Sequence, residues 1–332
     1  MNLNASGLLV ATRALTEAGS LAITASHVAG ARVIDCGVRA PGSDAAGLAM
    51  AEAALAGLGR VWIEPTGSHD AGFDAAWPAC PWPVVAVRSE QPVTACLAAQ
   101  YAGWKVSDDG FFAMASGPIR AAIGREPLYD TIGCRERPPV AVGILEASAL
   151  PPEKVCRDLA AAAGVAPESL TLLVARTASP AGTLQVIARS LETALHKLHD
   201  LGFDLSRVVR GVGRAPLAPV ARNDLAAIGR TNDAILYGGF VTLEVRGDDE
   251  TLCDVGPRMV SRASEAYGEP FATLFTRAGG DFYALDPALF APALVELVNI
   301  DTGRRHRFGA LAPEIVGGSF APGAPSAASS GR

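Results

Sequence analysis

The chain has 332 residues and a formal charge of −6 at pH 7, with 49% apolar or aromatic and only 19% charged residues. About 25% of an average globular protein is charged, so this composition indicates a core-rich folded protein and excludes a largely disordered one. Phosphate binding needs clustered Lys and Arg, and the densest basic run covers only residues 304–307. We therefore expect no nucleic-acid partner.

The sequence also lacks the signals of membrane insertion and export. A spanning helix needs about 20 nearly uninterrupted apolar residues, whereas the Ala-rich run over residues 45–58 is shorter and contains Glu52. The N-terminus has no basic segment of the kind that begins a signal peptide. The six cysteines form no CxxC pair and are expected to be free thiols. We expect a cytoplasmic protein without a membrane partner.

The first half of the chain alternates helical and strand patterns. Apolar residues at helical spacing predict a helix over residues 6–29, and further helices are expected over 44–58, capped by Asp44, and over 91–102. Short strands are predicted over residues 32–38, 60–64, 83–87 and 111–115. This mixture favours an antiparallel or mixed sheet over regular βαβ units.

Beyond Pro151 and Pro152 the alternation continues. A helix is expected over residues 152–163 and one long helix over 183–201. Strand signals lie at residues 170–174, Leu217, Ile235 and 241–245, and residues 230–239 are interpreted as a loop that leads into a strand. Residues 211–213 contain Gly-x-Gly without the third glycine of a dinucleotide fingerprint and are interpreted as a turn.

These elements predict an α+β protein with two similarly built lobes, whose mixed sheets flank a deep pocket. We place the first lobe at residues 1–150, the second at 151–316 and a loose Gly/Ala/Pro/Ser-rich tail at 317–332, and allow for a crossing between lobes near the C-terminus. A weak internal sequence similarity is consistent with two lobes: residues 85–92 and 173–180 both have a strand pattern, an Arg, a hydroxyl residue and then Pro. Chance explains this internal similarity equally well.

Several common catalytic motifs are absent from the sequence. It contains neither a GxxxxGK[ST] phosphate loop nor a GxSxG nucleophile elbow. His196 and His199, three apart on the expected long helix, could be a metal-ligand pair, but without a nearby third ligand we favour a surface or packing pair. The chemistry must then depend on carboxylates, arginines and hydroxyls.

Arg189 and Glu192 are the most informative charged residues. They lie three apart beside an apolar stripe of the expected helix, so their side chains share one face. An ordinary surface ion pair, worth about 0.3 kcal/mol, is the reading that the residues alone favour. The alternative is an acid–base pair in which the Arg holds the Glu in place and shifts its pKa.

Other polar and aromatic stretches suggest a ligand site. Residues 100–104 combine an amide, two aromatic rings and a glycine, a set able to stack on a flat heterocycle and bind its edge. Residues 115–120 suggest a strand that ends in a tight turn, where backbone N–H groups become available. Ordinary packing and turn chemistry explain either stretch equally well.

Taken together, these stretches resemble methenyltetrahydromethanopterin cyclohydrolases, from residue 2 to about residue 313. The most specific segments are QYAGW (100–104), SGPIR (116–120), ARSLETALHKLHDLGFDL (188–205), GRTNDAILYGG (229–239) and ASEAYGEPFATLF (263–275). The Ala- and Arg-rich composition resembles a bacterial member of the family. The tail after residue 317 lies outside the resemblance.

The resemblance implies a reversible hydrolysis of 5,10-methenyltetrahydromethanopterin to the 5-formyl form, in the one-carbon metabolism of formaldehyde-oxidising, methylotrophic bacteria. It implies a homotrimer of two-lobed subunits and no metal or cofactor. The catalytic Arg and Glu of the family match Arg189 and Glu192, which strengthens the acid–base reading. The sequence leaves open whether the carrier is phosphorylated, which direction operates in the cell and whether tetrahydrofolate derivatives react.

The resemblance also suggests substrate-binding residues. Tyr101 and Trp104 are expected to pack on the pterin ring, Gln100 and Asn232 to reach its edge, and Ser116 and Gly117 to contact the reacting C–N region. Further substrate-site residues are Arg120 and, with the weakest support, Tyr237 and Glu146.

Two alternatives to the cyclohydrolase remain at this stage. One is a formyl transferase or dehydrogenase that acts on the same carrier, which would need a second substrate site. The other is a non-catalytic binding protein for the pterin carrier, which the absence of Arg189 or Glu192 would have favoured.

Overall fold

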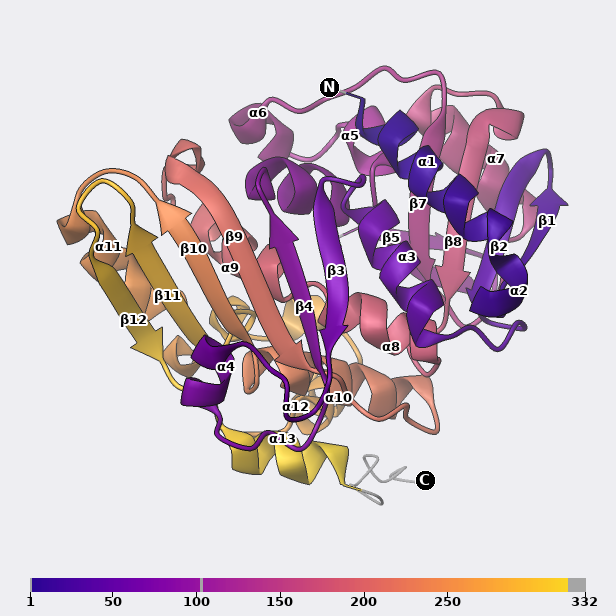
Figure 1. Ribbon diagram of the computed structural model, residues 1–332. Helices are drawn as coiled ribbons and strands as arrows, with labels where there is room; N and C mark the ends of the chain where they lie inside the picture. Colours follow the sequence, from indigo (N-terminus) through magenta and orange to yellow (C-terminus); the bar gives the residue numbers. More distant parts are fainter. Residues whose placement is uncertain (1, 102–103, 322–332) are drawn as a thin grey trace.

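The computed structural model describes residues 2–101 and 104–321, which form two six-stranded mixed sheets with helices packed against them (Figure 1). Sheet 1 has the order β1-β2-β8-β7-β6-β5, and sheet 2 has the order β12-β11-β10-β9-β4-β3. The predicted α+β class with mixed sheets is therefore confirmed. Within the described residues, no helix has the length and apolar character needed to cross a membrane.

Sheet 1 is parallel in its centre, where β8 pairs with β2 and β7, and antiparallel toward both edges. Its strands are β1 (Thr24–Val28), β2 (Ala31–Gly37), β5 (Trp104–Asp108), β6 (Phe111–Ser116), β7 (Ala141–Glu146) and β8 (Leu170–Ala175). Alternate residues of β8 enter different cores: Leu172 packs toward α7, whereas Leu173 packs toward α1 and α3. The central strands β2, β7 and β8 are thus covered on both faces, which explains why they are nearly continuously apolar and buried.

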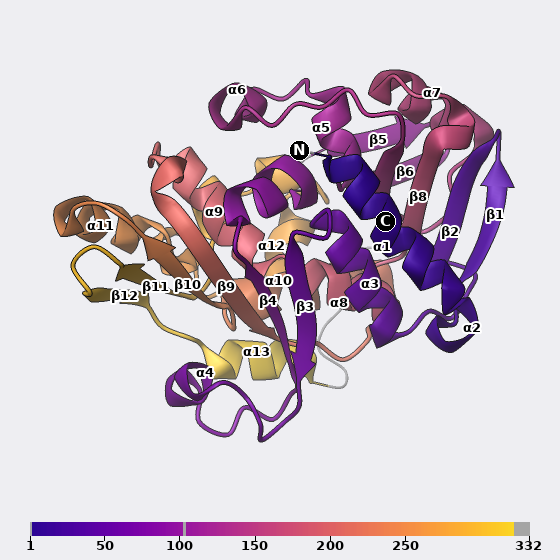
Figure 2. The same cartoon turned by 45° about the horizontal axis from the view of Figure 1, so that its top comes forward.

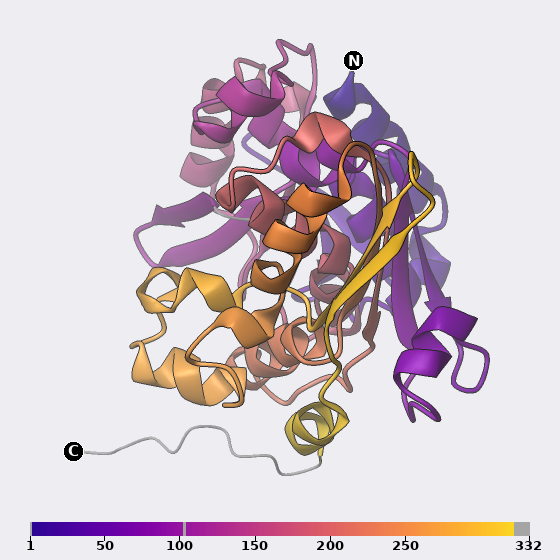
Figure 3. The ribbon, with the colours of Figure 1, turned by 90° about the vertical axis from the view of Figure 1, so that its left-hand side faces the viewer.

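Sheet 2 is antiparallel except for the β10–β11 pair. Its strands are β3 (Gly59–Glu64), β4 (Val84–Ser89), β9 (Val208–Pro216), β10 (Phe240–Val245), β11 (Leu294–Asn299) and β12 (Arg305–Gly309). Helices gather on one face of this sheet, as its edge-on view shows (Figure 3). That face carries the largest apolar core of the described chain.

The helices connect and cover these sheets, and α1 and α3 lie side by side over sheet 1 (Figure 2). The α-helices are α1 (Leu3–Thr16), α2 (Ala18–Leu21), α3 (Asp44–Ala54), α4 (Ala71–Ala76), α5 (Ile119–Ile123), α6 (Leu128–Ile132), α7 (Glu153–Ala163), α8 (Pro180–Ile187), α9 (Ser190–Asp200), α10 (Asp224–Leu236), α11 (Asp249–Val255), α12 (Phe271–Arg277) and α13 (Pro313–Phe320). A π-helix spans Val93–Gln100, and 3₁₀ turns lie at Pro167–Ser169, Leu205–Arg207, Gly256–Arg258, Ser261–Ala263, Phe282–Ala284 and Pro287–Leu289.

The two sheets do not divide at residue 150, the boundary expected between lobes. Sheet 1 takes β8 from the second half of the chain, and sheet 2 takes β3 and β4 from the first half. The two similar segments, residues 85–92 and 173–180, fall on β4 and β8, each followed by a helical segment. However, β4 is antiparallel to both of its neighbouring strands, whereas β8 is parallel to both of its neighbours. The similarity of the two segments therefore does not extend to the way their strands pair in the sheets.

Four sequence-based predictions about helices are wrong. In place of the single helix expected over residues 6–29, α1 ends at Thr16, the short α2 ends at Leu21, and the chain then forms strand β1. The N-cap of α3 is Ser43, whose side chain accepts from the Ala46 amide, and not Asp44. The long helix over residues 183–201 is interrupted between α8 and α9. Residues 230–239, interpreted as a loop, mostly lie within α10, and so does Ile235.

The remaining differences concern residues 211–213 and the tail. Residues 211–213 lie within β9 and not in a turn. Residues 317–320 complete α13, because Phe320 is buried and packs edge-on against Trp82 at 5.0 Å between ring centroids. The predictions for residue 102, at the end of the expected helix, and for residues 322–332 of the tail lie outside the described residues.

Candidate active site

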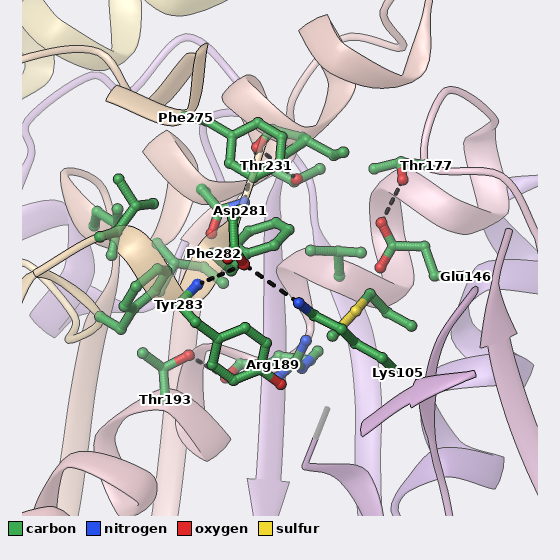
Figure 4. A pocket seen from close by; sticks show the side chains of 18 of the residues that line it. Lys105, Glu146, Thr177, Arg189, Thr193, Thr231, Phe275, Asp281, Phe282 and Tyr283 are labelled. Carbon is green, nitrogen blue, oxygen red and sulfur yellow. Dashed lines mark hydrogen bonds and ion pairs between the residues drawn. The ribbon is translucent and has the colours of Figure 1, made fainter. Parts of the chain in front are cut away.

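A cavity of about 580 Å³ lies between the end of sheet 1 and the helices on sheet 2. From the side of sheet 1 it is lined by β5, β6 and residues that follow β7 and β8, and from the other side by α9, α10 and residues 275–290. Its walls are mostly apolar, with a few convergent charged and hydroxyl groups, as is usual for small-molecule sites. Figure 4 shows Lys105, Glu146, Arg189 and Asp281 around this space.

Arg189 and Glu192 meet at the start of α9, where both line the cavity. The Arg189 Nε and Nη2 atoms donate to the same Glu192 oxygen, at 3.1 and 2.7 Å. The Glu192 side chain is only 2% exposed and that of Arg189 is 20% exposed. The pair is therefore not the exposed surface ion pair that the residues alone favoured.

The break between α8 and α9 fixes this pair in place. Gln100, at the end of the π-helix, donates its side-chain amide to the Ala188 carbonyl at the break. The start of α9 also approaches β9 very closely: a Cβ atom on Gly213 would lie 2.7 Å from the Leu191 amide nitrogen. A glycine is therefore required at this position of β9 because α9 packs so closely on the strand, and not because the chain turns there.

The Glu192 carboxylate stabilises the charged form of Arg189. Burial by itself would lower the pKa of Arg189, but the adjacent Glu192 carboxylate outweighs this effect and raises the pKa above its usual value. Glu192 also lies in the first turn of α9, where the helix dipole favours a negative charge. An ionised carboxylate with one oxygen engaged by a guanidinium has its other oxygen available to accept a proton.

Glu146 is a second carboxylate in the cavity, at the end of β7. Its side chain accepts a hydrogen bond from the Thr177 hydroxyl (Figure 4). Burial raises the pKa of Glu146, whereas the Thr177 hydrogen bond and the charge of Arg189 act in the opposite direction. Besides its aspartates, the cavity therefore has two glutamates with different environments. The sequence singled out Glu192, whereas Glu146 was, with Tyr237, among the residues with the weakest support.

Tyr101 contributes an aromatic wall next to α9. It directly follows the π-helix Val93–Gln100, whose i→i+5 geometry is rare and frequent at functional sites. Its ring stacks on His196, with 4.4 Å between centroids and 18° between planes, and the Arg120 guanidinium carbon lies 4.7 Å from its centroid. Burial raises the pKa of Tyr101 to about 12, so the phenol is neutral at physiological pH.

An aromatic cluster and an ion pair form the opposite wall. Phe275, Phe282 and Phe290 line the cavity, with Phe275 and Phe282 at 4.5 Å between centroids. The Lys105 ammonium of β5 lies 3.3 Å from the Asp281 carboxylate and 4.2 Å from the Tyr283 centroid, so it joins the two sides of the cavity. No motif in the sequence points to Lys105, Asp281 or Thr177, since none belongs to a recognisable pattern.

Of the predicted site residues, Arg189, Glu192, Tyr101, Asn232 and Glu146 line the cavity. The Asn232 side-chain amide donates to the Ile228 carbonyl of its own helix at 2.8 Å. None of the described residues donates a hydrogen bond to the side-chain oxygen of Asn232, which can therefore accept from another group.

The other predicted residues do not line this cavity; they are Gln100, Trp104, Ser116, Gly117, Arg120 and Tyr237. Arg120 is fully buried and pairs with Glu126, and Tyr237 donates its hydroxyl to the Glu269 carbonyl. Ser116 is buried at the end of β6, Gly117 follows it with φ +92°, and Trp104 packs in the α7 side of sheet 1. The intervening residues 102 and 103 lie outside the described residues.

The histidine pair considered for metal binding is divided between two environments. His196 lines the cavity against Tyr101 and approaches Asp200, with Nδ1 to Oδ2 at 3.5 Å, whereas His199 does not line it. Among residues 2–101 and 104–321, no three His, Cys, Asp or Glu side chains are arranged to hold a metal ion.

Comparison with known proteins gives a consistent family. The model of the cyclohydrolase (MCH) family matches residues 2–320. A methenyltetrahydromethanopterin cyclohydrolase of Methylobacterium sp. (strain 4-46) is 45% identical over 92% of this chain and 94% of the relative. Proteins of the same name from Xanthobacter autotrophicus and Methanocella arvoryzae (strain DSM 22066 / NBRC 105507 / MRE50) are 44% and 40% identical, over 87% of this chain and 83% and 88% of the relatives.

Proposed function

The chain belongs to the cyclohydrolase (MCH) family, and from this premise we propose which of its groups carry out the family's reaction. It is a hydrolase that opens the cyclic amidine of 5,10-methenyltetrahydromethanopterin with water, giving the 5-formyl form. The relatives support this function and not the alternatives of a formyl transferase or a non-catalytic binding protein.

The observation that carries the assignment of roles is the buried Arg189–Glu192 pair on the cavity wall. The substrate carbon lies between N5 and N10 in a cationic amidinium, and water must add to it. Glu192 accepts a proton from that water, a role that typically contributes about 10²–10⁴-fold to rate. Arg189 orients the Glu192 carboxylate and stabilises negative charge that develops on the attacking oxygen. The carboxylates of Glu192 and Glu146 also attract the cationic substrate.

The walls of the cavity suit a flat heterocycle that is rich in donors and acceptors. Tyr101 and the aromatic cluster offer ring faces, and the free side-chain oxygen of Asn232 offers an acceptor for the edge of the ring. We assign indirect roles to the residues outside the cavity wall: Gln100 holds the break before α9, and Arg120 supports the ring of Tyr101. Contacts of the substrate with Trp104, Ser116, Gly117 and Tyr237 remain predictions from the resemblance.

The test is a spectrophotometric assay of methenyltetrahydromethanopterin, following the loss of the methenyl chromophore. Glu192→Gln is expected to lower kcat by about 10²-fold or more, because the amide cannot accept the proton. Glu153→Gln, which removes a carboxylate from an exposed ion pair on α7, is the matched control and is expected to be fully active. Equal rates for Glu192→Gln and the parent protein would keep the function but remove Glu192 from the role of base.

Finer features of this function rest on the resemblance. We propose a cytoplasmic homotrimer that serves formaldehyde oxidation in a methylotrophic bacterium and needs no metal or prosthetic group, since Glu192 and Arg189 supply the base and the charge. Light scattering that gives a mass of one or two chains would contradict the trimer. Loss of activity in a chelator, restored by added metal, would contradict metal-independent catalysis.

A further inference from the structure

Each forward turnover of this reaction releases one proton inside the cavity. The water oxygen bonds to the methenyl carbon, the C–N10 bond breaks with its electron pair on N10, and a formyl C=O forms. Of the two water protons, one ends on N10 and the other leaves as H⁺. Glu192, the proposed base, is only 2% exposed, so it cannot readily pass this proton directly to solvent.

Three titratable side chains of α9 line the cavity at a spacing of four residues: Glu192, His196 and Asp200. Residues four apart share one face of a helix, with about 6 Å between Cβ atoms. Their side-chain exposure increases in order, from 2% for Glu192 to 26% for His196 and 39% for Asp200. The sequence of groups therefore runs from the buried base to the solvent.

We propose that His196 relays the proton from Glu192 to Asp200 and so to solvent, and returns it in the reverse reaction. This inference rests on the proposed function of Glu192 as the base. The His196 Nδ1 atom lies 3.5 Å from Asp200 Oδ2, so a small movement of either side chain brings the two atoms within hydrogen-bond distance. Its other ring nitrogen is then available to receive the proton, since an imidazole can accept at one nitrogen and donate at the other.

The surroundings of His196 fit this role. Its ring is held parallel to that of Tyr101 from the segment after the π-helix, which fixes the plane in which both nitrogens lie. Burial lowers the pKa of His196, while Glu192 and Asp200 raise it and His199 and Lys197 lower it further, with a net shift downward. This downward shift favours the neutral imidazole, which is the form that can accept a proton.

The test uses two variants and a matched control, assayed as purified full-length protein at low buffer concentration. His196→Gln removes the titratable ring, and His196→Phe keeps an aromatic ring against Tyr101 but cannot carry a proton. Both are expected to lower kcat at least about tenfold with little change in KM, within the range typical of proton-transfer groups. Added imidazole is expected to restore much of the lost rate. His199→Gln, on the same helix but not at the cavity, is expected to match the parent protein.

Three results would overturn the relay. They are full activity of His196→Gln, full activity of His196→Phe, which would show that only the stacking matters, and a loss that no small buffer restores. If the parent protein is active and Glu192→Gln is not, these results reject the relay alone. If the parent protein does not hydrolyse the methenyl substrate at all, the proposed function fails and the relay fails with it.

Discussion

The Lys105 ammonium group lies 3.3 Å from the Asp281 carboxylate, and this contact links β5 of sheet 1 to the segment that closes the opposite side of the cavity. Both side chains are about half exposed, at 42% and 51%. An exposed pair of this kind contributes little to folding, about 0–1 kcal/mol, and is weakened by salt. Its position across the cavity suggests that it matters for substrate binding instead.

Lys105→Met is therefore expected to raise KM several-fold and to change the melting temperature by no more than about 3 °C. Lys154→Met is the matched control, because Lys154 forms an exposed ion pair on α7 away from the cavity. Kinetics and thermal unfolding of both variants decide the question. A large drop in melting temperature with unchanged KM would show that Lys105 has a structural role only.

Arg189→Lys tests the geometry of the catalytic pair and not only its charge. Two nitrogens of Arg189 hold one oxygen of Glu192, and a Lys ammonium cannot reproduce this planar arrangement. We expect kcat to fall by about 10–100-fold, with KM changed much less, since the charge remains. A Lys variant with parental kcat, measured in the same chromophore assay, would mean that only the positive charge is needed.

The sequence could predict the strands better than the helices around the site. Runs such as residues 60–64 and 170–174 lie in strands because their apolar β-branched pattern is local. The break in the helix before Ser190 could not be predicted, because no Pro or Gly lies at the break. It depends instead on the hydrogen bond from Gln100 and on the close approach of α9 to Gly213, which has no side chain. Glu192 was found because family resemblance marked it, whereas Lys105 and Thr177 become visible only when distant segments meet.

Thr177→Val is expected to shift the pH dependence of substrate binding. The Thr177 hydroxyl donates to Glu146 and opposes the rise in its pKa that burial causes, so removing the hydroxyl should raise this pKa further. A cationic substrate is attracted by ionised Glu146, and the acidic limb of kcat/KM should therefore move to higher pH. Glu146→Gln cannot ionise at this position, so the acidic limb of its kcat/KM profile should lack the part that is due to titration of Glu146. Superimposable profiles for all three proteins would exclude Glu146 as a group that senses the substrate charge.

Asp233→Asn is expected to stabilise the protein above neutral pH. Burial raises the pKa of Asp233 to about 7, against hydrogen bonds from Ser319 and from the Phe271 amide. The unfolded chain ionises this group near pH 4 but the folded protein does not until about pH 7, so stability falls as pH rises through this window, by about 1.4 kcal/mol for each pKa unit. Below pH 4 the group is protonated in both states and has no effect.

Urea unfolding at pH 5 and pH 8 measures this effect. The free energy of unfolding should fall less between these two pH values in Asp233→Asn than in the parent protein. The amide keeps an oxygen that can accept from the Phe271 N–H. Asp254→Asn, at an exposed i,i+4 pair, should behave as the parent does. The same pH dependence in parent and Asp233→Asn would show that Asp233 is already ionised in the folded protein at pH 5.

Cys253 is expected to react first among the six thiols with a disulfide reagent such as dithionitrobenzoate. It is the exposed cysteine, and its Sγ lies 3.5 Å from His306 Nδ1. His306 Nε2 lies 2.9 Å from Asp249, and this contact lowers the pKa of Asp249 to about 2. The ionised carboxylate holds the proton on Nε2 and leaves Nδ1 as an acceptor for the thiol.

Burial instead raises the pKa of Cys36 to about 12 and of Cys156 to about 11, which slows their reaction. Cys253→Ser should remove the fast phase, and His306→Gln should slow it while leaving the number of fast thiols at one. A fast phase that survives Cys253→Ser would place the reactive thiol elsewhere, with the half-buried Cys134 as the next candidate.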